Sequence, residues 1–217
     1  TASPHGPVPV CGRCSAGRDA AAPREARVMS DRPISRFDVP DLDDLPDDIR
    51  EQILAVQAKS GFVPNVFLAF ARRPAEFRAF FAFHDALMDS DDGLSKAERE
   101  LIVVATSAVN QCLYCVVAHG AILRIRTKNP LLADQVATNP AKADLSERER
   151  HIVEYALKVA TDSANVDDAD LEAMRSHGFT DDEIWDIGAI TALFALSNRY
   201  ANFTGMRPND EFYAMAR

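Results

Sequence analysis

The residues most able to do chemistry lie close together between Glu100 and Arg124. Two cysteines, Cys112 and Cys115, are three positions apart, and His119 follows four positions later. If this stretch is helical, the three side chains form one stripe, because residues three and four apart share a helical face. A Cys-x-x-Cys pair at the start of a helix favours a thiolate and a reversible disulfide, with thiol pKa values of roughly 3.5–7.5 in such motifs.

A turn near Asn110 and Gln111 would bring a carboxylate to this stripe. Asn is a good helix N-cap and tolerates a left-handed conformation, so the chain can reverse there into an antiparallel helical hairpin. Glu100 lies ten residues before Asn110 and His119 nine after it, which places the two level, with Glu98 half a turn farther out. Carboxylate, imidazole and thiol would then form a proton relay able to deprotonate a cysteine.

This stretch resembles the signature of the AhpD-like, or carboxymuconolactone decarboxylase-like, superfamily, in which Glu is followed twelve residues on by Cys-x-x-Cys-x-x-x-His. The segment ERELIVVATSAVNQCLYCVVAHGA is most similar to the peroxidase-related branch of this superfamily. The segments from Ser60 to Phe70 and from Thr180 to Thr204 also resemble that branch. The resemblance covers roughly residues 40 to 206. It implies an all-α AhpD-like helical bundle, with the cysteine motif at the start of a helix in the hairpin.

The resemblance also implies roles for these residues. Cys115 would attack a hydroperoxide and become a sulfenic acid, Cys112 would resolve it as a disulfide, and Glu100 and His119 would move protons. A dithiol protein or lipoyl group would return the electrons, and neither a cofactor nor a metal ion is expected. The best-studied members carry a second His just before the second cysteine, where this chain has Tyr114. Tyr donates hydrogen bonds but is a poor base near neutral pH, so we expect a supporting role.

Two other functions compete with the peroxidase. A lactone decarboxylase shares the fold, but it would leave the cysteine pair without a role. A metal-binding structural module could use Cys112, Cys115 and His119, although a tetrahedral zinc ion would need a fourth ligand from elsewhere.

Composition narrows the class of protein. The chain has 217 residues, 47% of them hydrophobic, and a formal net charge of −9. Nucleic acids and anionic membranes attract basic surfaces, so neither is expected as a partner. No apolar run approaches the roughly 20 residues that span a bilayer, and Thr1 to Ala26 lacks the apolar core of a signal peptide. With a catalytic cysteine pair, this favours a reducing cytoplasm.

Residues 1–28 differ in composition from the rest. They hold four of the twelve prolines and show no apolar periodicity, so we expect a disordered N-terminal extension, with Met29 as a natural start. Cys11 and Cys14 form a second Cys-x-x-Cys pair there. The two Cys-x-x-Cys pairs are separated by many more residues than the pairs of a ribbon-type zinc module. The thiols of Cys11 and Cys14 are therefore interpreted as incidental. Residues 29–217 are expected to form the helical domain.

Helix signals recur through that domain, and no strand pattern is found. Helices are predicted from Pro46 to Gly61, Pro64 to Ala71, Pro74 to about Ser90, Ser95 to the turn, the turn to Thr127, Leu131 to Thr138, Ser146 to about Ala160, Val166 to His177, and from Thr180 onward. Capping boxes are predicted at Ser95, Ser146 and Thr180. Glu98 is accounted for as a cap, which leaves Glu100 as the functional carboxylate. His84 is expected to be structural or exposed, and His151 is expected to be exposed.

The helix after Thr180 is apolar along most of its length, especially between Ile184 and Phe203. Such a helix should be buried on most sides, in a core or a subunit interface. We therefore expect a homo-oligomer, and the resemblance points to a trimer or hexamer.

Overall fold

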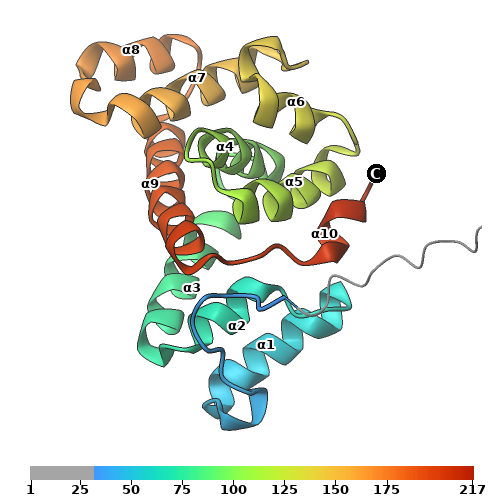
Figure 1. Ribbon diagram of the computed structural model, residues 1–217. Helices are drawn as coiled ribbons and strands as arrows, with labels where there is room; N and C mark the ends of the chain where they lie inside the picture. Colours follow the sequence, from blue (N-terminus) through green and yellow to red (C-terminus); the bar gives the residue numbers. More distant parts are fainter. Residues whose placement is uncertain (1–31) are drawn as a thin grey trace, which may run out of the picture. The chain divides into compact units, whose positions relative to one another are not determined.

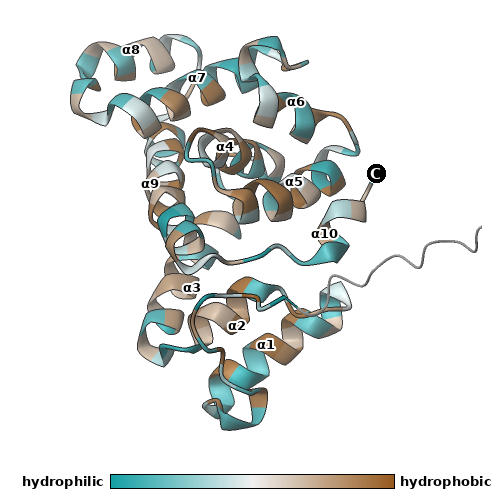
Figure 2. Cartoon of the chain, viewed as in Figure 1, coloured by the Kyte–Doolittle hydropathy of each residue, from teal (hydrophilic) through white to brown (hydrophobic). Residues whose placement is uncertain are grey.

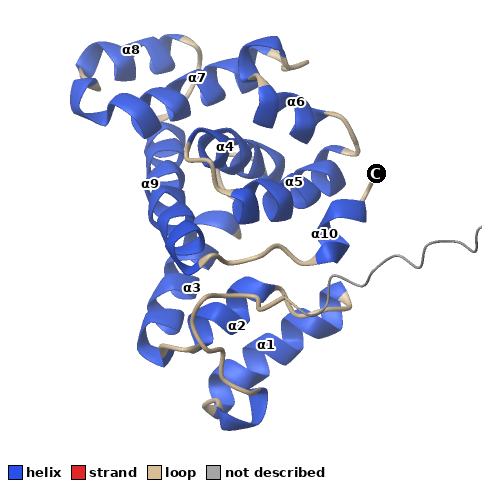
Figure 3. Ribbon diagram, viewed as in Figure 1, coloured by secondary structure: helices blue, strands red, loops and turns tan. Residues whose placement is uncertain are grey.

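The computed structural model describes residues 32–217, and all regular structure in that range is helical (Figure 3). The expected all-α fold is confirmed. The α-helices are α1 (Asp47–Ser60), α2 (Asn65–Ala71), α3 (Pro74–Met88), α4 (Lys96–Val109), α5 (Leu113–Thr127), α6 (Leu132–Thr138), α7 (Glu147–Asp162), α8 (Asp168–Ser176), α9 (Asp181–Thr204) and α10 (Asp210–Ala214). The expected extension 1–28, with Cys11 and Cys14, lies outside the described residues.

Helix α4 is the central element of the unit formed by Pro33–Arg217. It packs against α5, α6, α7 and α9, which surround it in Figure 1. Every residue from Arg99 to Ser107 is buried. A helix buried on all sides must be apolar on all sides, and the ribbon of α4 is largely brown in Figure 2. The polar residues that α4 does carry therefore need partners inside the protein.

The predicted helix boundaries agree with the structure where capping signals define them. Ser95, Ser146 and Thr180 each form a capping box with the Glu three residues on. Helix α8, predicted from Val166 to His177, is present but begins later than expected, at a capping box made by Asp167 and Asp170. The short helix α10 near the C-terminus was not predicted.

The α4–α5 turn is where the prediction was partly wrong. Asn110 ends α4, but the left-handed residue is Gln111, with φ of 53°, and the N-cap of α5 is Cys112. The Cys112 N–H donates to the Ser107 carbonyl over 2.9 Å. The Asn110 side chain instead contacts Asn198 of α9, and the N-cap of α5 is provided by Cys112.

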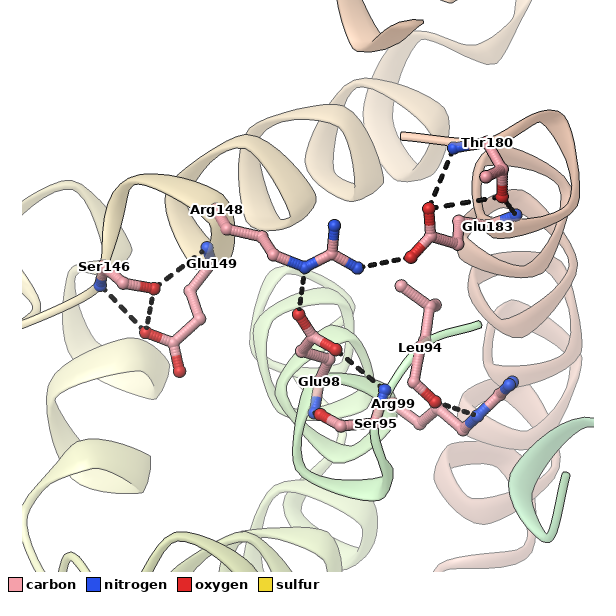
Figure 4. A network of polar contacts seen from close by, with 9 residues as sticks. All are labelled: Leu94, Ser95, Glu98, Arg99, Ser146, Arg148, Glu149, Thr180 and Glu183. Carbon is pink, nitrogen blue, oxygen red and sulfur yellow. Dashed lines mark hydrogen bonds and ion pairs between the residues drawn. The ribbon is translucent and has the colours of Figure 1, made fainter. Parts of the chain in front are cut away.

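Two arginines tie the helix ends together around α4. Arg99 is fully buried and donates to the carbonyls of Leu87 (2.7 Å), Asp92 (2.7 Å) and Leu94 (3.1 Å), the last of which is drawn in Figure 4. It also pairs with Asp186 of α9 over 2.9 Å. The α3–α4 connection is thereby held by one buried cation whose three nitrogens each have an acceptor, as burial of a charge requires.

Arg148 of α7 joins two of the capping boxes (Figure 4). Its guanidinium donates to Glu98 over 2.6 Å and to Glu183 over 2.5 Å, the acidic members of the α4 and α9 boxes. Burial acts to raise the pKa of Glu183, but the Thr180 N–H and the Arg148 guanidinium outweigh it and hold that pKa below its usual value. The N-terminal ends of α4, α7 and α9 thus meet at one charged cluster.

Helix α9 is less covered than its composition suggested. Its inner side is buried, including Ile187, Ile190 and Phe194. Its outer side leaves Trp185 75% exposed and Phe203 53% exposed in this chain. The expectation of burial on most sides is therefore not met by the single chain. Within residues 32–217, each helix is too short or too polar to cross a membrane.

The ion pairs of Arg148 with Glu98 and Glu183 should make the stability of the protein depend on pH. Replacing Arg148 with Met should lower the free energy of unfolding by about 1 kcal/mol near neutral pH, allowing for solvent screening of the 40% exposed guanidinium. Because the folded pKa of Glu183 is lowered, this contribution is present above the ordinary glutamate value of 4.5 and is lost as pH falls through the folded value.

Urea unfolding near neutral pH and again in acid measures this difference. Arg50→Met is the control, since within residues 32–217 the ion pair of Arg50 is with Asp47 alone, whose side chain is 83% exposed. It should cost less than about 0.5 kcal/mol. A penalty for Arg148→Met that is equal at both pH values would contradict the assignment.

Candidate active site

The hairpin brings Glu100 of α4 to His119 of α5, as its predicted register requires. Nδ1 of His119 lies 2.7 Å from a carboxylate oxygen of Glu100. Their side chains are only 13% and 10% exposed. A carboxylate oxygen without a proton can only accept, so in this bond Nδ1 of His119 is the donor whenever Glu100 is ionised. The edge-on ring of Phe194, with centroids 4.8 Å apart, packs against the imidazole.

The two cysteines are reduced, buried and in contact at the start of α5. Cys112 is the N-cap, and its sulfur accepts the N–H of Cys115 over 3.4 Å. The Cys115 thiol also donates to that sulfur, which lowers the pKa of Cys112 although burial opposes it. The same hydrogen bond, together with burial, raises the pKa of the Cys115 thiol. Of the two thiols, Cys112 is the one whose pKa these surroundings lower.

Two residues of α9 that sequence reasoning missed complete the surroundings of the sulfurs. The Ser197 hydroxyl lies 3.9 Å from the sulfur of Cys115. The amide of Asn198, which is fully buried, acts by hydrogen bonding to lower the pKa of both thiols. A signal was present in the sequence, because Ser197-Asn198 is a polar pair directly after the run ITALFAL. Its position opposite the cysteines required the tertiary structure.

Tyr114, predicted as a supporting residue, anchors α5 to α2. Its buried hydroxyl accepts the N–H of Val66 over 3.1 Å. Burial raises the pKa of the phenol, so Tyr114 is neutral at physiological pH. A neutral phenol bonded to the backbone positions the helix that carries both cysteines.

The other acidic and histidine residues considered in the sequence have partners outside this site. Glu98 is engaged with Arg148 and with the N–H of Ser95, as a cap. His84 bonds Asp85 over 2.9 Å. His151, expected to be exposed, instead stacks on His177 with ring centroids 3.6 Å apart and has a side chain only 20% exposed. Among the described residues, no group of three or more His, Cys, Asp or Glu side chains could hold a metal ion.

Taken together, the start of α5 carries the two cysteines, and one turn later it carries His119, which is paired with Glu100 of α4. The Cys112–Cys115 pair can exchange two electrons by forming a disulfide, and the Glu100–His119 pair one turn later can accept and return a proton. In the part of the chain that is described, no hydrogen bond joins His119 to either sulfur. The two pairs are related by their places along the same helix, with Phe194, Ser197 and Asn198 of α9 facing them.

Comparison with known proteins identifies families and structures that are similar to this chain. The model of the carboxymuconolactone decarboxylase family matches residues 74–137, which include all the site residues of α4 and α5. No curated protein is detectably similar in sequence.

Solved structures cover most of the chain. An uncharacterized peroxidase-related protein from Ralstonia eutropha, described as an alkylhydroperoxidase AhpD core, is 67% identical over 86% of this chain and 98% of its own, with a TM-score of 0.85. An uncharacterized peroxidase-related protein from a Silicibacter species is 39% identical over 88% and 100%, with a TM-score of 0.82. The debrominase Bmp8 shares the fold, at 17% identity over 84% and 95% and a TM-score of 0.68. The chain belongs to the AhpD-like, or carboxymuconolactone decarboxylase-like, superfamily, alongside these peroxidase-related proteins.

Proposed function

We propose that the protein is a thiol-dependent peroxidase that reduces a hydroperoxide to an alcohol and water. The observation that carries the proposal is a buried, reduced Cys112–Cys115 pair one helical turn from a Glu100–His119 pair bonded over 2.7 Å. A disulfide-forming pair supplies two electrons, and a paired imidazole moves the protons that peroxide cleavage needs. Membership of a superfamily with peroxidase-related relatives supports the same chemistry.

The reaction proceeds in two steps that balance. His119, oriented by Glu100, takes the proton of Cys115, and the Cys115 thiolate attacks the outer oxygen of the hydroperoxide. The O–O bond breaks, the alkoxide takes the proton from His119 and leaves as the alcohol, and Cys115 becomes a sulfenic acid. The Cys112 thiolate, the better stabilised of the two, then attacks that sulfur and expels hydroxide, which is protonated to water. A disulfide remains.

The disulfide must be reduced before another turnover. Thiol–disulfide exchange with a dithiol protein or a lipoyl group supplies the two electrons and two protons. Such donors operate in a reducing compartment, so we propose the cytoplasm as the place of action.

We also propose that the protein works as a homo-oligomer, with a second copy covering the outer side of α9. Trp185, Leu196 and Phe203 are 75%, 48% and 53% exposed along this one helix. Exposed apolar residues gathered on one element are typical of an interface. A trimer or hexamer is the expected assembly.

Glu100→Gln should slow the reaction of the cysteines near neutral pH by roughly 10²–10⁴-fold, because the amide keeps the shape of the carboxyl group but cannot stabilise the positive charge that His119 gains when it takes the proton. The rate should recover toward that of the wild type at high pH, where the thiolate forms without a base. Glu98→Gln is the matched control and should affect only stability. The pH profile of cysteine alkylation measures both; a shift with Glu98→Gln alone would show that the base is misassigned.

The roles of the cysteines are tested by replacing each with Ser and trapping the sulfenic acid after one equivalent of peroxide. Cys112→Ser should accumulate a stable sulfenic acid on Cys115, whereas Cys115→Ser should remain unmodified. The reverse pattern would exchange the two roles. In the wild type, peroxide should remove two thiols, and steady-state consumption should require a dithiol donor. No loss of thiols with peroxide would reject the peroxidase.

Light scattering tests the assembly. The mass should be a multiple of the 23.8 kDa chain, and Trp185→Glu should lower it, because a charge would be buried at the contact. A wild-type protein that remains a monomer at micromolar concentration would contradict the proposal.

A further inference from the structure

The hydroxyl of Ser197 has a different partner from the other hydroxyls of its helix. Thr191 and Thr204 of α9 each donate to the carbonyl four residues earlier, over 2.8 Å and 2.7 Å. A serine or threonine in the middle of a helix ordinarily makes this bond or points to solvent. Ser197 is only 6% exposed, and among residues 32–217 its hydroxyl has one hydrogen-bond partner, the sulfur of Cys115 at 3.9 Å. This hydroxyl is therefore turned toward the sulfur and is not used by its own helix.

The direction of this hydrogen bond depends on the state of the sulfur. When Cys115 is a thiol, either atom can be the donor. A thiolate has no hydrogen and can only accept, so the Ser197 hydroxyl must then donate. The separation of 3.9 Å is long, but catalytic hydrogen bonds are often long in the resting protein and shorten during the reaction. Because hydrogen bonds to charged groups are stronger than those between neutral groups, this contact favours the thiolate of Cys115 over its thiol.

The two sulfurs of the pair have different donors. The sulfur of Cys112, the N-cap of α5, accepts the N–H of Cys115 over 3.4 Å. The sulfur of Cys115 is contacted from α9 by the Ser197 hydroxyl, which makes no such bond to Cys112 within the described chain. The hydrogen bond with Cys112 and burial raise the pKa of the Cys115 thiol, and the Ser197 hydroxyl acts in the opposite direction. Ser197 thus acts on the cysteine to which we assign the attack on peroxide.

The other polar side chains near Cys115 are engaged with one another or with the backbone. The phenol of Tyr114 is bonded to the backbone of α2, and burial keeps it neutral by raising its pKa. Glu100 of α4 and His119 of α5 are bonded to each other over 2.7 Å. The amide of Asn198 is bonded to two residues at the end of α4. The side chain of α9 that has its hydrogen bond to the sulfur itself is the serine hydroxyl.

We infer that Ser197 is a catalytic residue, whose hydroxyl donates a hydrogen bond to the Cys115 thiolate and shifts the negative charge of the reduced pair toward the cysteine that attacks. The inference rests on the proposed function for the use made of that thiolate. When the pair loses its first proton, the charge is shared between two sulfurs that lie three residues apart. A donor that contacts only one of them changes this division, so Ser197 selects the attacking sulfur.

The test compares the labelling of the two cysteines in the wild type and in Ser197→Ala. Each reduced protein is treated near neutral pH with less than one equivalent of iodoacetamide, then unfolded, and its remaining thiols are blocked with a second reagent. Trypsin cleaves after Arg99 and Arg124, so both cysteines lie on one peptide, and fragmentation of that peptide locates the first label. Both sulfurs are buried at the start of α5, so the ratio of the two labels cancels their common accessibility.

The ratio of label on Cys115 to label on Cys112 should fall about tenfold in Ser197→Ala. The reason is that a hydrogen bond to a charged group corresponds to about one pH unit in the titration of a thiol. The substitution removes one oxygen atom, and Ala has the higher helix propensity, so we expect the variant to fold. Circular dichroism checks this.

Thr191→Val is the control for loss of a buried hydroxyl from the same helix. The Thr191 hydroxyl is bonded to the carbonyl of Ile187, so its removal should leave the labelling ratio unchanged. An unchanged ratio in folded Ser197→Ala would overturn the inference, as would an equal change with Thr191→Val.

Labelling uses no peroxide, so its result stands apart from the peroxidase activity. A lowered ratio in Ser197→Ala, together with a wild type that consumes no peroxide, would uphold Ser197 as the donor to Cys115 and reject the peroxidase. Peroxide turnover by the wild type with an unchanged ratio in the variant would do the opposite.

Discussion

The site depends on a chain reversal at Gln111 and Cys112. Gln111 takes a left-handed conformation that costs a non-glycine residue free energy, and the chain can accept this cost because the flanking backbone is held on both sides. Ser107 receives the Cys112 N–H, and α9 holds Asn110. The reversal sets the register of α4 against α5, and from that register follows the 2.7 Å contact between Glu100 and His119. It also makes Cys112 the first capping group of α5.

Buried polar groups of α9 then adjust the chemistry of the cap. An N-cap thiol already faces free N–H groups, and the Cys115 N–H and the Asn198 amide add donors in surroundings from which water is excluded. Hydrogen bonds are electrostatically stronger in such surroundings, and an unpaired group there is costly. The network is complete, because the oxygen and nitrogen of Asn198 both have partners. A satisfied network of this kind favours one arrangement of the turn over its alternatives.

Ion pairs and hydrogen bonds of two arginines, Arg148 and Arg99, fix the position of α9 relative to the α4–α5 hairpin. Arg148 joins the first turns of α4 and α9 from a position in the first turn of α7 (Figure 4). Arg99 links the α3–α4 connection to Asp186 of α9. Each arginine is surrounded by acceptors, so its desolvation is offset by several hydrogen bonds. Three helices thereby start from one cluster, and the direction of α9 across the cysteines follows from its start.

The sequence by itself determined the helices, the hairpin and the pairing of Glu100 with His119. These depend on local rules: capping boxes at Ser95, Ser146 and Thr180, helical periodicity, and the equal distances of Glu100 and His119 from a turn. Only the tertiary structure decided which residue caps α5, which thiol holds the charge, and what faces the sulfurs. The last of these depends on Ser197 and Asn198 of α9, some eighty residues from the cysteines along the chain. Local spacing carries no information on such a contact, because packing of α9 against α4 and α5 creates it.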